Sequence, residues 1–122
     1  MPFFQLNEID STNIVEGFDA QFIHTPFATY SYIRVKMGAI LPLHAHFQEQ
    51  VTTVISGKFQ LTVEEVDYVL ESGSVFVIPQ DVPHSGYAIS DCYILDVFTP
   101  FRADYKAKGG IDISSWGKKS NG

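Results

Sequence analysis

Short runs of alternating hydrophobic and polar residues fill the middle of the chain. The clearest run, KFQLTVEE, places Phe59, Leu61 and Val63 on one side of an extended backbone, which is typical of a half-buried strand. Turn-forming residues, mostly glycine, proline, serine and aspartate, separate the runs. No stretch shows the period of a long helix. We therefore predict strands over residues 30–37, 58–65, 74–79 and 91–98.

Strands of this kind at about ten-residue spacing are typical of a β-sandwich or barrel, so the predicted fold class is all-β. A chain of 122 residues fits one domain, here residues 1–122, and is long enough to bury a core. We expect the barrel over about 28–102, strands within 1–27, and a loose tail over about 106–122. Three apolar residues of this tail could dock on the body or on a second subunit: Ile111, Ile113 and Trp116.

Composition limits the class, the partners and the expected cellular compartment of this domain. Hydrophobic residues make up 45% of the chain and charged residues 18%, as in folded rather than disordered proteins. The net charge of -6 argues against nucleic acid or an anionic membrane as the main partner. No apolar run has membrane-spanning length, and the first residues lack a secretion signal. The single cysteine, Cys92, allows no internal disulfide and fits a reducing cytoplasm, with a core thiol as its expected role.

The stretch HAHFQEQ places two histidines near several oxygen-bearing side chains. On a strand, His44 and His46 point to the same side, and the same alternation puts Gln48 and Gln50 with them and Glu49 opposite. Alternation therefore favours Gln50 over Glu49 as a third metal ligand, provided that no bulge intervenes. Gln48 could be displaced by a turn.

A further histidine, His84 in IPQDVPHSG, lies between a proline-stiffened turn and a Ser-Gly pair and is the expected fourth ligand. Two imidazoles hold a divalent ion only where further ligands converge with them. An isolated His-x-His is by itself more often a pair of surface or hydrogen-bonded side chains. The pattern surrounding the three histidines decides between these two readings.

The stretch from 38 to 88 resembles the two motifs of the cupin superfamily. GAILPLHAHFQEQVTTVISG follows the first motif, with Gln50 where cupins usually have glutamate, and GSVFVIPQDVPHSGYA follows the second, with its ligand at His84. Two departures are Asp81, where the family often has glycine, and Ala88, where it often has asparagine; neither is a ligand position. The resemblance implies a double-stranded β-helix, or jelly-roll barrel, with the metal ligands inside one mouth.

The shell expected on this basis is His44, His46, Gln50 and His84, with His24 outside both motifs in a structural or surface role. All four ligands are neutral, so one bound divalent ion would keep its full charge. Such a shell suits Lewis-acid chemistry or the docking of an anion and leans against oxygen activation, which in mononuclear iron sites often uses a carboxylate ligand. Mixed nitrogen and oxygen ligation admits zinc, nickel, iron, manganese or cobalt.

A third stretch, DCYILDVFTPFRADY, offers catalytic candidates. Asp96 and Phe98 share one strand face, and Arg102 follows in the next loop. If this strand lines the barrel, the carboxylate could transfer a proton, the guanidinium could bind a substrate carboxylate, and the ring could pack on a sugar. The alternative is a buried or capped aspartate, a core phenylalanine, and a surface arginine paired with Asp104.

HAHFQEQ, PQDVPHSG and DVFTPFR together resemble the small single-domain cupins of the pectin-degradation (KdgF-like) family over about 38–102. Those proteins open the ring of 4,5-unsaturated uronates to linear keto-deoxyuronates. The resemblance implies Asp96 as acid/base, Arg102 as the substrate-binding arginine and Phe98 as the pocket aromatic. One departure is Thr52, where that family can carry a second pocket glutamine.

The sequence also allows two functions other than ring opening, and an oligomeric state is expected. The alternatives to ring opening are a metal-dependent dioxygenase and a non-catalytic barrel that binds a small anionic ligand. A homodimer is expected because small cupins usually pair. The phenylalanines that would supply its contact, or would instead fill the core, are Phe3, Phe4, Phe18, Phe22 and Phe27.

Overall fold

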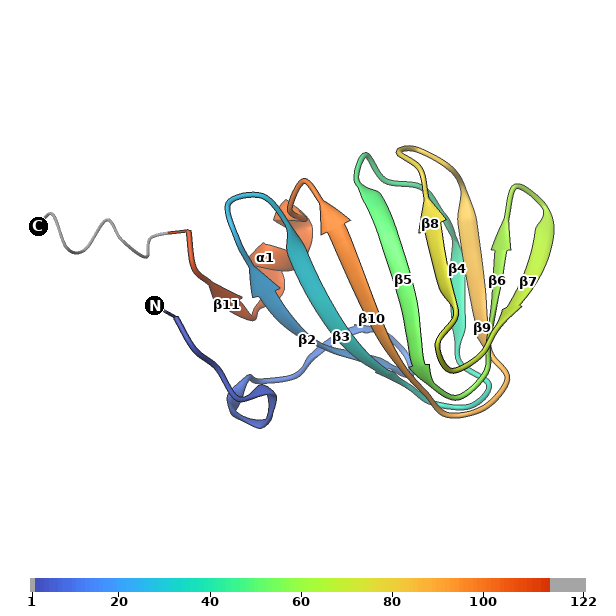
Figure 1. Ribbon diagram of the computed structural model, residues 1–122, viewed down its shortest axis with the longest axis horizontal. Coiled ribbons are helices and arrows are strands. Elements are labelled where there is room, and N and C mark those ends of the chain that lie inside the picture. The colour runs from blue at the N-terminus through green and yellow to red at the C-terminus, as the bar shows by residue number, and fades with distance from the viewer. Residues whose placement is uncertain (1, 115–122) are drawn as a thin grey trace, which may run out of the picture.

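The computed structural model describes residues 2–114, and most of them lie in β-strands (Figure 1). The predicted all-β class is confirmed. Among the described residues, no helix is long and apolar enough to cross a membrane. In chain order the elements are η1 (Leu6–Glu8), β1 (Thr12–Val15), β2 (Phe18–His24), β3 (Thr29–Val35), β4 (Ile40–His44), β5 (Glu49–Ser56), β6 (Phe59–Val63), β7 (Val66–Leu70), β8 (Val75–Ile78), β9 (His84–Ala88), β10 (Cys92–Thr99), α1 (Ala103–Lys108) and β11 (Ile111–Asp112).

Over residues 2–114 the strands form a seven-stranded and a four-stranded sheet. The larger sheet has the order β1-β2-β3-β10-β5-β8, with β11 beside β2, and the smaller has the order β4-β9-β6-β7. In Figure 1 β10 lies between β3 and β5, which precede it by several strands in the chain. All of these pairs are antiparallel except β11 with β2, which is parallel. This arrangement is the jelly-roll architecture predicted from the sequence.

The alternation of the sequence matches the burial of the strands. β6 buries Phe59, Leu61 and Val63, as predicted, but it ends at Val63 rather than at residue 65. Glu64 and Glu65 adopt left-handed backbone angles, with φ of 50° and 68°, and turn the chain into β7. The hairpin partner β7 was not predicted because four of its five residues are exposed and its pattern does not alternate.

Two neighbouring rows of inward-facing side chains cross the larger sheet and set the position of the site. They run across strands β2, β3, β10, β5 and β8, and nearly all of their members are buried. The first row is His24, Thr29, Phe98, Gln50 and Ile78; the second is Phe22, Ser31, Asp96, Thr52 and Phe76. Candidate residues that are far apart in sequence are therefore neighbours in space.

The segment after β10 is regular as far as residue 114, whereas we expected a loose tail from about residue 106. Residues 103–108 form α1, which packs against β2. Ile111 pairs with Ile23, and the Ile113 backbone N–H donates to the His24 carbonyl over 2.9 Å. Of the three apolar residues expected to dock, Ile111 and Ile113 thus contact the body, and Trp116 lies outside the described residues.

The five phenylalanines considered for a dimer contact divide between core and surface. Phe18 and Phe22 are buried in the hydrophobic core. Phe4 is half-buried, whereas Phe3 and Phe27 are 80% and 78% exposed. Only the last two are free to contact another molecule to any large extent.

Candidate metal centre

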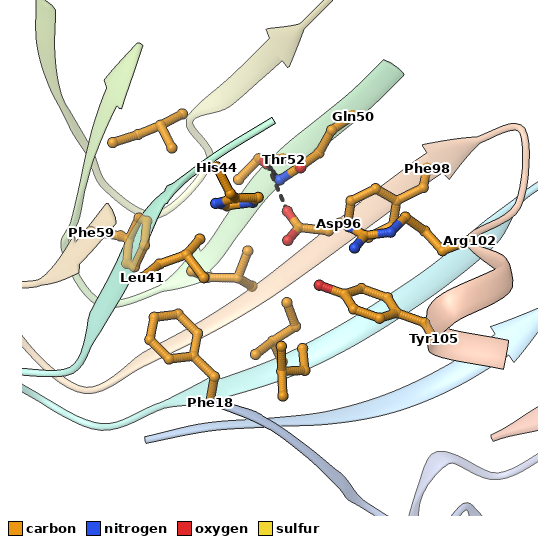
Figure 2. Close-up of a pocket in the computed structure, with 14 residues that line it drawn as sticks. Phe18, Leu41, His44, Gln50, Thr52, Phe59, Asp96, Phe98, Arg102 and Tyr105 are labelled. Carbon is orange, nitrogen blue, oxygen red and sulfur yellow. Dashed lines mark hydrogen bonds between the residues drawn. The ribbon is translucent and has the colours of Figure 1, made fainter. Parts of the chain in front are cut away.

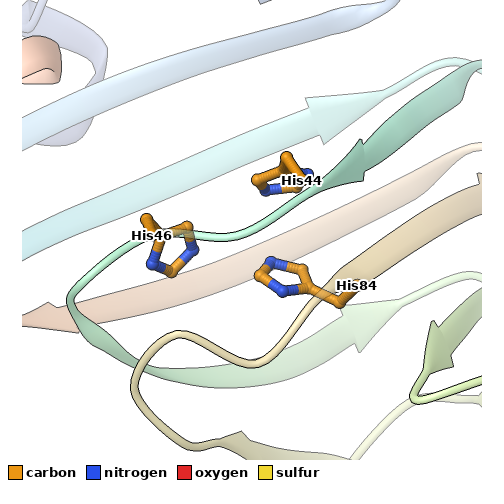
Figure 3. Close-up of side chains that lie close together, drawn as sticks. All are labelled: His44, His46 and His84. Carbon is orange, nitrogen blue, oxygen red and sulfur yellow. The ribbon is translucent and has the colours of Figure 1, made fainter.

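Three histidines converge at one mouth of the barrel (Figure 3). His44 ends β4, His46 lies in the connection to β5, and His84 begins β9. One ring nitrogen from each lies within 4.8 Å of the others. His44 and His84 are cross-strand partners in the smaller sheet. The sheet register, rather than the His-x-His spacing alone, therefore completes the cluster.

Hydrogen bonds to backbone carbonyls determine which nitrogen of each ring is free. The Nδ1 atoms of His44, His46 and His84 lie 2.7, 3.0 and 2.9 Å from carbonyl oxygens, which can only accept. Each Nδ1 therefore carries the proton, and in a neutral ring Nε2 presents a lone pair. Burial is the main cause that lowers the pKa of His46 and of His84, the latter to about 4, so both rings are neutral at pH 7.

Converging lone pairs repel one another unless a cation lies between them. His84 Nε2 is buried and has no hydrogen-bond partner among residues 2–114. Neutral imidazoles oriented by carbonyl groups through the other ring nitrogen are the usual arrangement of histidine metal ligands. The donor set therefore fits a divalent transition metal, as the sequence predicted, and a three-histidine site is the part that the geometry supports directly.

Gln50 is the oxygen-bearing side chain that faces this cluster. Its Oε1 lies 3.0 Å from His46 Nε2, and the side chain is buried. Because that nitrogen already presents a lone pair, two acceptors face each other, an arrangement that a shared cation relieves. Glu49 is exposed, and the Gln48 amide instead donates to the Phe101 carbonyl over 3.1 Å. Of the three candidates after the histidines, only Gln50 reaches the cluster.

The alternation argument reached Gln50 although its premise was incomplete. The chain is not one strand from His44 to Gln50, because residues 45–48 lie outside the strands between β4 and β5.

The departure from the family pattern at Asp81 has a local structural explanation. Its φ of 62° is left-handed, which explains the usual glycine, and aspartate tolerates this region better than most residues. The Asp81 N–H donates to the His46 carbonyl over 2.9 Å and holds the two ligand loops together.

Asp96 lies on β10 with its carboxylate directed into the barrel. Thr52, its cross-strand partner on β5, donates a hydrogen bond to Oδ1 over 2.6 Å. Burial raises the pKa of Asp96 to about 6, although the bonds from Thr52 and Gln50 and the charge of Arg102 lower it in part. A carboxyl group with this pKa can both take and give a proton near neutral pH.

Arg102 is buried and held between two aromatic rings. Its Cζ lies 3.8 Å from the centre of the Tyr105 ring and 4.9 Å from that of Phe98. Nε and Nη2 donate to both oxygens of Asp104, over 3.0 and 2.6 Å. The expected alternative of a pair with Asp104 is thus present, but the arginine lies inside the protein rather than on its surface. Nη1 is buried and, within the described chain, without a partner.

These groups line one pocket (Figure 2). Its polar end contains His44, Gln50, Thr52, Asp96 and Arg102, and its opposite end is apolar. In Figure 2 Phe98 and Tyr105 flank the guanidinium, while Phe18, Leu41 and Phe59 lie at the apolar end. The structure therefore brings all three predicted catalytic residues into one pocket with two of the predicted ligands, His44 and Gln50.

Tyr105 also lines this pocket, and it was not predicted from the sequence. Tyr105 follows Arg102 by three residues, a spacing that a helix would place on one side, but six residues gave too little pattern to predict one. His24 is fully buried: Nε2–H donates to the Gly109 carbonyl over 2.9 Å, and Nδ1 accepts from the Thr29 hydroxyl over 3.0 Å. The Thr29 hydroxyl accepts from the Arg102 N–H, so His24 has the structural role expected of it.

Comparisons with known proteins agree with this fold. Solved structures that resemble the chain include KdgF from Halomonas sp., which is 28% identical with a TM-score of 0.81 over 86% of this chain and 98% of that chain. An RmlC-like cupin from Shewanella frigidimarina NCIMB 400 is also 28% identical, with a TM-score of 0.80 over 84% and 94%. Salicylate 1,2-dioxygenase from Pseudaminobacter salicylatoxidans, at 19% identity and a TM-score of 0.67 over 71% and 27%, shares the fold alone.

A comparison with curated proteins finds no match. The sequence pattern of the cupin domain matches residues 31–98, which include the three histidines, Gln50 and Asp96. This match covers more than half of the chain, and the chain belongs to the cupin domain family.

Proposed function

We propose that this protein opens the ring of a small 4,5-unsaturated uronate with the help of one divalent transition metal ion. The observation that carries the proposal is the shared pocket of a carboxyl group of pKa about 6, Asp96, and a buried guanidinium with a free N–H group, Arg102, beside the ligand His44. The resemblance to KdgF-like cupins supports the substrate class. His44, His46, Gln50 and His84 would hold the ion.

The residues of the pocket have different roles in the proposed reaction. Arg102 Nη1 donates to the substrate carboxylate, and the Phe98 ring packs on the sugar. An ion held by the four ligands would supply Lewis-acid polarisation of a substrate oxygen. Asp96 takes the proton of the ring hemiacetal hydroxyl while the ring C–O bond breaks, which gives an aldehyde and an enolate. Asp96 then returns the proton to the enolate carbon, which gives the ketone, so no proton is gained or lost overall.

The test is the loss of the ultraviolet absorbance of the conjugated double bond, measured against the spontaneous reaction without protein. We expect Asp96→Asn to lower the rate by about 10²–10⁴-fold, the usual contribution of a general acid/base, while metal content is retained. Asp10→Asn, on an exposed position, is the matched control and should have the activity of the wild type. Full activity of Asp96→Asn would refute the role assigned to this carboxylate.

Elemental analysis of protein purified without chelator tests the metal site by itself. We expect about one divalent ion for each chain, and loss of it in His44→Ala and in Gln50→Ala. Bound iron together with oxygen consumption would support the dioxygenase alternative instead. Metal binding without turnover of any uronate would support a non-catalytic binding barrel.

We also propose a homodimer as the assembled form. The exposed Phe3 and Phe27 rings are the support for it, since Phe18 and Phe22 belong to the core. Light scattering should give twice the chain mass of 13.6 kDa. A mass of one chain at working concentrations would rule the dimer out.

A further inference from the structure

Thr52 connects the candidate ligand Gln50 to the candidate acid/base Asp96. Its hydroxyl oxygen accepts from the Gln50 Nε2 amide over 2.9 Å, and its proton goes to Asp96 Oδ1 over 2.6 Å. Thr52 is 3% exposed and lies between the two residues on the inward face of the larger sheet. Figure 2 shows these contacts beside His44 at the polar end of the pocket. The sequence marked this position only as a departure from a related family.

The direction of these hydrogen bonds follows from the number of protons that each group can donate. A threonine hydroxyl has one proton, and an ionised carboxylate can only accept. Asp96 therefore takes the single proton of Thr52, and the Thr52 oxygen has only lone pairs left for Gln50. Only the NH₂ end of the Gln50 amide can face such an oxygen. The amide oxygen is consequently directed at His46 Nε2, 3.0 Å away, on the side where the three histidines converge.

We infer that Thr52 is a positioning residue that selects the metal-facing end of Gln50. This inference rests on the metal site of the proposed function. A glutamine amide has two ends of nearly the same shape, and only the oxygen end can bind a cation. Without the hydroxyl, the amide can turn its NH₂ group toward the histidines, where it donates to a lone pair and competes with the ion.

Metal affinity is the direct measurement, because it needs no substrate. Thr52→Val keeps the shape of the side chain and removes the hydroxyl, and we expect it to weaken zinc or cobalt binding by about 10–100-fold, as other residues that orient metal ligands do. Thr52→Ser keeps the hydroxyl and should restore the affinity. Thr53→Val is the matched control, because Thr53 is the next residue of β5 and alternates to the opposite face of the sheet.

A second measurement separates orientation of the ligand from packing. Gln50→Glu gives the ligand two equivalent oxygens, so no hydroxyl is needed to select between them. Thr52→Val should therefore cost much less affinity in the Gln50→Glu background than in the wild type. The visible spectrum of bound cobalt should change in Thr52→Val alone and not in Thr52→Ser. If Thr52→Val does not fold, Thr52→Ala gives the same comparison.

Equal losses from Thr52→Val in both backgrounds would overturn the inference and leave a packing role. Wild-type affinity and spectrum in Thr52→Val would overturn it as well. Absence of metal binding in the wild type would refute both the inference and the proposed metal centre. If the affinities behave as expected but no uronate is opened, the proposed reaction fails and the role of Thr52 stands.

Discussion

Asp96 should lower the stability of the metal-free protein at neutral pH, because the folded chain buries an ionised carboxylate. Its pKa rises from the ordinary 3.8 to about 6, mainly through burial. At 1.36 kcal/mol for each pKa unit, this difference corresponds to a cost of about 3 kcal/mol at pH 7. Asp96→Asn removes the charge and keeps an oxygen that can accept from Thr52. The variant should therefore be more stable than the wild type by about that amount.

The pH dependence gives the sign of the effect. Above about pH 6 the carboxyl group is ionised in both the folded and the unfolded chain, and the cost of burial is fully present. Below about pH 3.8 it is protonated in both, and the cost is absent. Between these values the folded chain binds more protons, so the stability of the wild type falls as the pH rises. The advantage of Asp96→Asn should grow over the same range.

Urea unfolding of chelator-treated protein at several pH values measures this difference in the free energy of unfolding. In thermal unfolding at pH 7, the melting temperature of Asp96→Asn should be roughly 10 °C above that of the wild type. Asp104→Asn is the control with the opposite sign, because the hydrogen bonds from Arg102 lower the pKa of Asp104. That variant should be less stable than the wild type at neutral pH. The reasoning is refuted if Asp96→Asn is no more stable than the wild type at pH 7, or if the gain in stability does not change with pH.

Other predictions concern the metal, the turns and the core. Zinc at 100 times its dissociation constant should stabilise the chelator-treated wild type by about 2.7 kcal/mol in thermal unfolding, and His84→Ala should show no such rise. Gly57→Ala should cost roughly 3 kcal/mol in urea unfolding, because the backbone φ is +89° and the new Cβ would clash with the Asp91 carbonyl oxygen; an unchanged midpoint would contradict this. His24→Ala should cost a similar amount, about 3 kcal/mol, since it leaves a cavity and unpaired buried groups; a loss within about 0.5 kcal/mol, as at an ordinary surface position, would argue against its structural role. Cys92 should react with thiol reagents only slowly until the protein unfolds, because it is buried and burial raises its pKa; fast labelling of the folded protein would count against this.

Local patterns gave four of the strands, β3, β6, β8 and β10, with ends within two residues of those observed. Alternation found β6 because one of its faces is buried, and it missed β7 because both of its faces are largely exposed. The turn at Glu64 and Glu65 contains no glycine, asparagine or proline, so nothing in the sequence signals the left-handed backbone found there. The short helix after Arg102 was missed because six residues are too few to show a helical period.

The position of Gln50 beside the histidines was predicted from the sequence through an incomplete premise. Alternation along one strand selected it, whereas the structure brings it to the histidines through a connection and the start of a new strand. Its neighbours Gln48 and Glu49 also carry side-chain oxygens that could bind a metal, at nearly the same position in sequence. Burial of one side chain and exposure of the other separate Gln50 from Glu49, and a contact with the Phe101 carbonyl removes Gln48.

The sequence by itself determined the all-β class, the family motifs and which side chains are candidates for the chemistry, because these depend on local period and on residue type at fixed spacing. Only the tertiary structure decided how these side chains act together. The raised pKa of Asp96, the burial of Arg102 and the bond from Thr52 to Asp96 depend on neighbours from other strands and loops, and the convergence of the three histidines depends on the pairing of β4 with β9. Such contacts join residues that are distant in the chain, and burial makes each of them stronger than it would be in water.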